Sequence, residues 1–335
     1  MHPRPDFIDR RPGRHHGRRA ERGAALLLAM LVLTLVATLA SSMAWQQSRS
    51  VQLETAERAS MQAGWILSGA LDWARLILRE DTRAGGADHL GEPWATPLAE
   101  ARLSTFLAAD RDNNADSGPE AFLSGAIVDE QSHYNLRNLI GPDGKVVPAE
   151  LRALERLCEA AGLPTDTPAR LAEGLRAAWG ATNQGGAEDA ESPLAPTRVA
   201  QLTWLGIDAV SASRLEAFVT LLPVPTPVNA NTASREVLLA AIDGLDLGTA
   251  ERLVQARQRN PFNGLPSVQD QLPEGMKAED KRVSFRSSYF RIYGRLRLED
   301  RVLEERSLVE RRGADRGLEV VALQRERRSL RSDAR

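Results

Sequence analysis

Oxygen-bearing side chains recur at alternate positions in one short segment of the chain. Asp110, Asp112, Asn114 and Asp116 are spaced two residues apart, as the oxygen ligands of a calcium loop would be. An EF-hand loop has glycine at its sixth position. The segment departs from this pattern, because its glycine is Gly118. These residues favour either a calcium site or a polar loop that binds no metal.

Few other residues could carry out chemistry. The 335 residues include one cysteine, Cys158, and only His89 and His133 lie beyond the first 23 positions. The sequence has no Ser, His and acid cluster, HExxH, P-loop or CxxC, so nucleophilic and zinc chemistry lack their parts. We therefore expect no enzyme and no intramolecular disulfide, with the cysteine acting as a small buried hydrophobe.

The composition is that of a folded protein, with 42% hydrophobic and 26% charged residues. Its formal charge of -2 hides a local asymmetry, because residues 1–23 hold seven arginines. Residues 24–45 then carry no charge, and at about 1.5 Å per residue they cover the roughly 30 Å of a bilayer core. Basic residues before the run predict a cytoplasmic N-terminus and a C-terminal part on the other side of the membrane, which in a bacterium is the periplasm. A secretory signal cleaved after residue 40 or 44 is the alternative.

The segment after the apolar run continues with helical spacing. Residues 46–78 contain no proline, and Gly64 and Gly69 are the only helix breakers. Apolar side chains recur near a helical period at Met61, Trp65, Leu67, Leu71, Trp73, Leu76 and Ile77. We expect one helix from Ala24 to about Arg79, lipid-facing in its first half and docked on a soluble domain in its second.

A basic leader ending in glycine and followed by a long, half-hydrophobic helix resembles the type IV pilin and pseudopilin superfamily. The resemblance implies that a membrane peptidase cleaves after Gly23 and methylates the new N-terminus, Ala24. Most such subunits carry Glu at the fifth mature position, where this chain has Leu28. A plain single-pass anchor is the alternative interpretation of the same segment.

Leu28 is informative because placing a carboxylate inside the membrane costs free energy. An unpaired acid within a membrane helix costs about 2.5 to 3.5 kcal/mol on insertion scales, and in the superfamily it is thought to meet the amine of the neighbouring subunit. A helix without this acid suits the end of a filament. The class that usually lacks it is the large minor pseudopilin of type II secretion, protein K.

Two polar motifs support the resemblance to the protein K class. Residues 125–140 predict a β-strand that runs into an asparagine-rich turn, similar to the family's segment at Asn135, Leu136, Asn138 and Leu139. The family's Asn-x-Asn-Thr-Ala element is matched by Asn229, Asn231, Thr232 and Ala233.

Between residues 147 and 271 the pattern is helical, and it predicts helices at 148–162, 167–180, 197–206, 211–223, 232–242 and 248–258. Asn231 or Thr232 is placed to cap the fifth of these helices, and Gly244 and Gly248 to form the turn after it. The pair resembles a helix-hairpin-helix-like element.

Helix-hairpin-helix modules often bind DNA phosphates, so a membrane-anchored DNA-uptake protein is the alternative function. Arg252, Arg257 and Arg259 are its candidate phosphate contacts. Asp243 and Asp246 oppose it, because acids beside a phosphate cradle repel the ligand. We expect no nucleic-acid binding.

In the C-terminal part, apolar residues recur with a period of two, which predicts an antiparallel hairpin packed on one face. A last strand and an unstructured basic tail at 325–335 are expected after it. The expected fold is α+β: a pilin-like long N-terminal helix packed on an antiparallel sheet, with an inserted all-α domain. The domains predicted are a leader (1–23), a transmembrane half-helix (24–45), periplasmic helix and first strands (46–146), an α-helical insertion (147–275), a β-hairpin (276–312) and a last strand with a basic tail (313–335).

The resemblance to protein K also implies a function and partners. It implies a single-pass inner-membrane subunit that caps the periplasmic pseudopilus and helps to start its assembly. Implied partners are the minor pseudopilins of the I and J classes, other pseudopilins, the prepilin peptidase, and the secretin or exported cargo. It also implies calcium near Glu188 and Asp189, in the α region.

Overall fold

The computed structural model describes residues 18–103, 120–183, 193–298, 301–313 and 317–331. The chain divides into two compact units, residues 1–62 and 63–335. One helix, α1 (Arg18–Ala84), begins in the first unit and ends in the second. The predicted continuous helix is confirmed, and it extends from Arg18 to Ala84, beyond both predicted ends.

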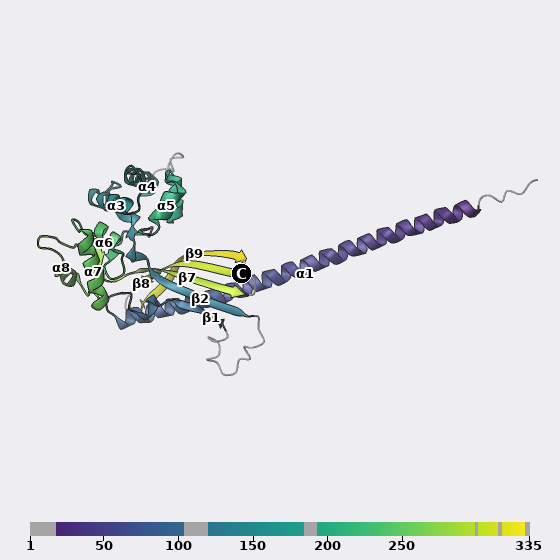
Figure 1. The fold of residues 1–335 in the computed structure, drawn as a ribbon, viewed down its shortest axis with the longest axis horizontal. Helices are drawn as coiled ribbons and strands as arrows, with labels where there is room; N and C mark the ends of the chain where they lie inside the picture. The colour runs from purple at the N-terminus through teal and green to yellow at the C-terminus, as the bar shows by residue number, and fades with distance from the viewer. Residues whose placement is uncertain (1–17, 104–119, 184–192, 299–300, 314–316, 332–335) are drawn as a thin grey trace, which may run out of the picture. The chain divides into compact units, whose positions relative to one another are not determined.

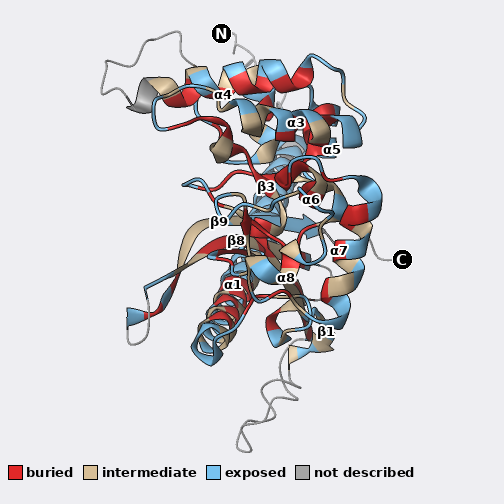
Figure 2. Ribbon diagram, turned by 90° about the vertical axis from the view of Figure 1, so that its left-hand side faces the viewer, coloured by how far each residue is buried: buried red, intermediate tan, exposed pale blue. Residues whose placement is uncertain are grey.

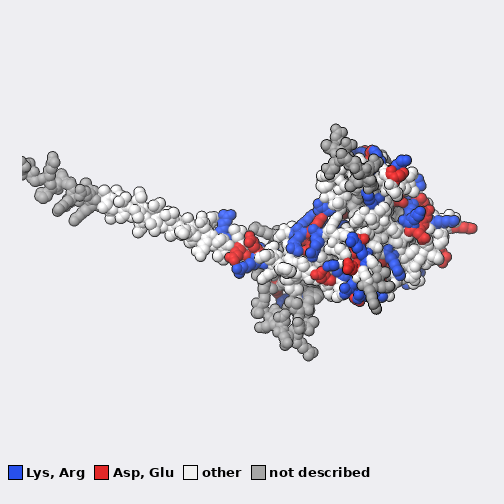
Figure 3. Space-filling view, turned by 180° about the vertical axis from the view of Figure 1, so that it is seen from behind, with Lys and Arg blue, Asp and Glu red and all other residues white. Residues whose placement is uncertain are grey.

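In the first unit, α1 presents apolar side chains to its surroundings on every side. Residues 23–50 are exposed, and Figure 3 shows the apolar stretch of this helix as white atoms without acidic or basic side chains. Its few polar groups are bonded within the helix, because the Thr34 and Thr38 hydroxyls donate to the carbonyls of Leu31 and Leu35. Such internal bonding suits a helix in a medium without water.

The second unit contains a five-stranded antiparallel sheet in the order β1-β2-β7-β8-β9 (Figure 1). Its strands are β1 Leu98–Arg102, β2 Ala121–Asp129, β7 Tyr289–Leu298, β8 Arg301–Arg312 and β9 Glu319–Arg331. β2 pairs along its whole length with β7, from Ala121 opposite Leu298 to Asp129 opposite Phe290. The helical block between these two neighbouring strands is therefore an insertion in the sheet, as predicted.

The second half of α1 packs on one face of this sheet (Figures 1 and 2). The shared core is apolar and consists of Leu71, Ala74, Leu78, Trp94, Phe290, Ile292, Val309 and Val320. Trp94 meets the Phe290 ring edge-on, with ring centroids 5.2 Å apart. Four of the apolar positions predicted to dock do not, because Met61, Trp65, Trp73 and Leu76 are exposed.

Two glycines allow α1 and the strands to approach closely. Gly125 of β2 lies opposite Gly294 of β7. A Cβ on Gly125 would stand 2.7 Å from the carbonyl oxygen of Tyr293, and one on Gly294 would stand 3.1 Å from Leu67. Any side chain at Gly125 would therefore collide with the neighbouring strand.

The inserted block is built from short helices around its own core. They are α3 Pro148–Ala160, α4 Thr167–Asn183, the 3-10 helices η4 Leu136–Leu139 and η5 Val199–Leu205, α5 Ala209–Leu215, α6 Arg235–Ala241, α7 Leu247–Arg259 and α8 Leu265–Gln269. Acceptor side chains begin three of them: Asp208, Ser234 and Asp246 bond the amides of Ser211, Val237 and Thr249. Cys158 is buried in this core, as predicted.

Two short parallel strand pairs join the block, β3 (Tyr134–Asn135) with β4 (Val219–Thr220) and β5 (Val228–Asn229) with β6 (Val283–Ser284). The helix predicted at 211–223 therefore ends at Leu215. Its β-branched pair at 219–220 joins a strand instead.

The unstructured tail predicted from residue 325 is wrong up to residue 331, because β9 continues there. The strand is held by a buried acid, Glu305, which accepts from Arg327 at 2.7 Å and lies 3.2 Å from Arg325. Gly64 of α1 makes room for this pair, since a Cβ there would stand 2.7 Å from the Arg327 guanidinium. In the sequence, a run of arginines predicts a solvated tail. In the structure, Arg325 and Arg327 both face the Glu305 carboxylate.

Candidate assembly helix and buried asparagine junction

The residues predicted to be processed lie on the surface of α1. Gly23, Ala24 and Leu28 are exposed, and the Leu28 side chain lies in a shallow apolar surface with Ala25, Ala29 and Val32. Within the described residues, one helix, Gly23–Ala84, is long and apolar enough to cross a membrane. Small and apolar residues on one helix surface are suited to packing against another membrane helix.

The Asn-x-Asn-Thr-Ala motif lies in the interior. Asn229 is 0% exposed and ends the short strand β5. Its Nδ2 faces three acceptors, the Asp88 carbonyl at 3.1 Å, Asp129 Oδ2 at 3.0 Å and Ser287 Oγ at 3.0 Å. Its Oδ1 accepts from the amide of Asn231 at 2.9 Å. One side chain thus bonds segments from four parts of the chain.

Asp129, at the end of β2, is the central acceptor of these contacts. We call the buried group formed by Asp88, Asp129, Asn229, Thr232 and Ser287 the junction. Its Oδ2 also accepts from Thr232 Oγ1 at 2.6 Å and Ser287 Oγ at 2.7 Å, while Oδ1 accepts from the Gln131 amide at 2.8 Å. Burial raises the pKa of Asp129 to about 6, although these hydrogen bonds oppose the shift. The motif threonine is therefore a donor to a buried carboxyl.

A buried arginine extends the junction to α1. Arg311 of β8 donates to Asp88 Oδ1 and to Asp81 Oδ2, both at 2.6 Å. Burial raises the pKa of Asp81 to about 6, and the Arg311 charge opposes that shift. Asp81, Asp88 and Glu92 lie close enough to suit a metal ion. Two of them are bonded to Arg311, and the Glu92 carboxylate accepts from the amide of His89 and the Trp94 indole.

The cap predicted for α6 was wrong. Ser234 caps this helix, whereas Asn231 reaches across to residue 262, bonding the Phe262 carbonyl at 2.9 Å and its amide at 2.8 Å. Ala233 is 0% exposed, which leaves no room for a larger side chain. The motif therefore joins layers of the core instead of starting a helix.

The turn of the helix-hairpin-helix-like element differs from the predicted one. Gly244 takes the expected turn conformation with φ of +79°, but Gly248 lies inside α7, contrary to prediction. Arg257 is buried and donates to the Ala230 carbonyl at 2.6 Å. Asp243 lies 2.8 Å from Arg156. A predicted phosphate contact is thus used in the fold, and DNA binding is not favoured.

The asparagine-rich turn after β2 has a comparable structural role. Asn135 Nδ2 donates to the Val224 carbonyl at 2.7 Å. Asn138 bonds both the carbonyl and the amide of Thr226, each at 2.9 Å. Leu136 and Leu139 are 0% exposed. The predicted strand and turn are confirmed, and the turn holds the segment that leads into β5.

The predicted calcium ligands lie outside the described residues, namely Asp110, Asp112, Asn114, Asp116, Glu188 and Asp189. The junction residues Asp81, Asp88, Asp129, Ser287 and Arg311 were missed by sequence reasoning. The one available signal was Asp129, a single acid ending an apolar strand.

Comparison with known proteins identifies relatives of this fold. Two family models described as type II secretion system protein K match residues 132–224 and 228–285. The chain is 30% identical over 326 residues to type II secretion system protein K of Pseudomonas aeruginosa, covering 91% of this chain and 93% of that protein.

A solved structure has the same fold. It is the crystal structure of the GspK-GspI-GspJ complex from the enterotoxigenic Escherichia coli type 2 secretion system, with a TM-score of 0.57 and 17% identity. The match covers 81% of this chain and 98% of the matched one. Because it is 30% identical to a protein K over nearly its whole length, the chain belongs to the protein K family of the type II secretion system, whose members are minor pseudopilins.

Proposed function

We propose that this subunit caps the tip of the periplasmic pseudopilus and helps to initiate its assembly for the export of folded proteins. The observation that carries the proposal is Leu28, an apolar residue five positions after Gly23 in the exposed, charge-free segment 24–45 of α1. Such a helix can insert in the membrane, yet it offers no carboxylate to the amine of another subunit. It therefore suits a terminal position.

The proposal includes processing and membrane placement. Cleavage after Gly23 removes the basic leader and leaves Ala24 as a methylated N-terminus. The first half of α1 then spans the inner membrane, with the following domain in the periplasm. The arginines before the apolar run support this orientation.

The proposed partners are the I-class and J-class minor pseudopilins, with other pseudopilins, the peptidase, and the secretin or cargo as further contacts. The printed title of the matched structure names GspI and GspJ beside GspK, which supports the first two. Trp65, Trp73 and Leu76 are exposed on α1 and supply apolar surface for packing against a neighbouring helix. Calcium binding stays a prediction.

Mass spectrometry of the mature N-terminus tests the processing. We expect N-methylated Ala24 in membranes from cells that contain the prepilin peptidase. An intact Met1, or a terminus at Ser41 or Trp45, would contradict the pseudopilin proposal.

The tip position has its own test in Leu28→Glu. The variant should still be cleaved, but it should appear along sheared pseudopili and reduce secretion, because its carboxylate can pair with a neighbouring amine. Leu31→Glu is the matched control, since its acid lies three residues further from the N-terminus and should not restore that pairing. Equal behaviour of the two variants would exclude the proposed role of Leu28.

A further inference from the structure

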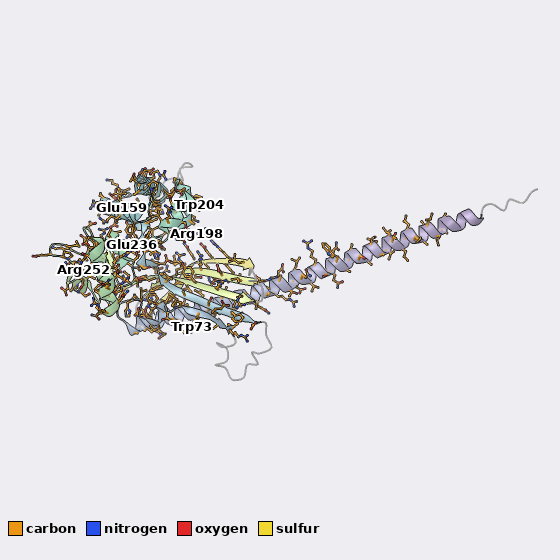
Figure 4. The ribbon with its side chains drawn as sticks, viewed as in Figure 1. Trp73, Glu159, Arg198, Trp204, Glu236 and Arg252 are labelled. Atoms are coloured by element: carbon orange, nitrogen blue, oxygen red, sulfur yellow. The ribbon has the colours of Figure 1, made fainter. Side chains whose placement is uncertain are left out.

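A polar cleft of about 410 Å³ lies between the helical block and the face of the sheet that points away from α1. It is lined by η5 and the segment at 216–221 on one side and by β7, β8 and β9 on the other. In Figure 4, Arg198 lies between the block that carries Trp204 and the strands. A volume of this size holds a small ligand or a few side chains.

The floor of the cleft is an ion pair that is already satisfied. Arg291 Nε lies 2.5 Å from Glu130 Oε1, and Thr220 donates to the same carboxylate. His133 lies beside this pair, and burial lowers the pKa of its imidazole, which is therefore uncharged at neutral pH. The floor thus contributes no net charge.

The rim, by contrast, combines one arginine in an ion pair with two that form none within the described part of the chain. Arg198 bonds Glu326 at 2.6 Å. Arg306 lies opposite Glu326 in the ladder and over the Tyr293 ring at 5.6 Å. Arg328, two residues beyond Glu326 on β9, lies opposite Glu304. Across the described residues, neither Arg306 nor Arg328 has a carboxylate within 4.0 Å.

The register places the two arginines within reach of one group. Arg328 is the diagonal neighbour of Arg306 across the β8–β9 ladder, a separation of roughly 7–8 Å. Arginines at this spacing can converge on a single carboxylate, which accepts charge-assisted hydrogen bonds from both.

The charge of the whole cleft selects the kind of anion. Four arginines line it, at 198, 291, 306 and 328, against three glutamates, at 130, 216 and 326. The excess is one positive charge. A single carboxylate balances it, whereas a phosphate dianion would also meet three acids.

We propose that this cleft binds one carboxylate side chain, a Glu or Asp of a partner protein, between Arg306 and Arg328. The Tyr293 ring and the side chains of Val219 and Leu221 line the space for the aliphatic part of that residue. The inference rests on the cleft alone and not on the proposed tip position.

Nuclear magnetic resonance of the arginine side chains tests the proposal. The full chain in detergent micelles, labelled with ¹⁵N arginine, is titrated with N-acetyl-glutamate amide and, separately, with N-acetyl-glutamine amide. Saturable shifts of the Arg306 and Arg328 Nε–H signals, assigned with Arg306→Lys and Arg328→Lys, are expected with the first probe. The second should bind roughly tenfold or more weakly, because it lacks the charge.

Matched variants separate a site from general attraction. The double variant R306A/R328A should weaken binding roughly tenfold or more, equivalent to about 1.4 kcal/mol, while K277A/K281A removes the same charge from exposed positions elsewhere and should not. Absence of saturable shifts, or equal weakening in both variants, would overturn the proposal. Tighter binding of inorganic phosphate than of N-acetyl-glutamate amide would overturn the assignment to a carboxylate.

Discussion

At the scale of single residues, Asn229 shows why an amide occupies the core of this protein. A buried side chain that both donates and accepts can satisfy Asp129 Oδ2 and the Asn231 amide together. An aspartate could accept but not donate, and an apolar residue would leave several groups without partners. Unpaired buried polar groups are costly.

Asn229→Ala is therefore expected to lower the free energy of unfolding by about 2–3 kcal/mol, because it leaves buried groups unpaired. Chemical denaturation of the full chain in detergent measures the change. Asn260→Ala, at an exposed position, is the control and should stay within about 0.5 kcal/mol of the parent. A loss at Asn229 no larger than at Asn260 would contradict the importance of the junction.

At the scale of elements, the junction joins the end of β2, the strand β5 inside the helical insertion, the segment just before β7, and the end of α1. Asp129 bonds Thr232 and Ser287, and Arg311 bonds Asp88 and Asp81. Because these segments meet through buried carboxyl groups, their connection depends on protonation.

The stability of the junction should rise as the pH falls. Asp129 has a pKa of about 6 in the folded chain against 3.8 as its ordinary value, so the folded state binds the proton more tightly. Its contribution is complete below about pH 4 and is lost as the pH rises through 6, a change of roughly 3 kcal/mol. Asp81 acts in the same direction, since its pKa is also raised to about 6.

Unfolding measured between about pH 4 and 6.5, the window that these pKa values define, tests this dependence. Asp129→Asn should show a smaller slope than the parent, whereas Asp280→Asn, at an exposed position, should keep the parental slope. His133, whose pKa is lowered by burial, is present in every variant and cancels in the comparison. Identical slopes for all three proteins would refute the assignment to Asp129.

Gly125 of β2 and Gly69 of α1 differ in the space around them, so the same change to alanine should have opposite effects on stability. Gly125→Ala should destabilise the protein by about 1–3 kcal/mol, since its Cβ would meet the Tyr293 carbonyl at 2.7 Å. Gly69→Ala in α1 meets nothing within 4 Å and should stabilise by about 0.5–1 kcal/mol through helix propensity. Thermal denaturation of both variants checks the opposite signs.

At the scale of the whole molecule, an exposed apolar helix segment precedes a folded domain along the described part of the chain. Arginines precede that segment, so the domain is expected on the far side of the membrane. The chain contains its own control for a labelling test, because Cys158 is 2% exposed and burial raises its pKa to about 12.

Asn260→Cys, at an exposed position, should react with a membrane-impermeant maleimide in intact spheroplasts. The parent protein should not react until it is denatured, since only an exposed thiolate is nucleophilic. Labelling of Asn260→Cys only after the inner membrane is permeabilised would place the domain in the cytoplasm and contradict the orientation.

The sequence by itself determined the local features of this protein. A charge-free run and an unbroken helical period determined α1, alternation determined β7 and β8, and the asparagine motif at 135–139 marked the turn at the start of the insertion. Each of these depends on residues close together in the chain, where periodicity and charge act directly. The leader, Leu28 and calcium predictions come from the same local patterns or from the resemblance that they support.

Tertiary structure alone decided which of these residues meet. Helical spacing could not tell that Leu71 faces the sheet while Trp65 and Trp73 face solvent, nor that the arginines of β9 pair with Glu305. The junction joins residues 88, 129, 229 and 287, which no local period connects. Burial depends on contacts with segments that are distant in the chain. The role of Asn229 therefore follows only from the packing of the insertion against the sheet.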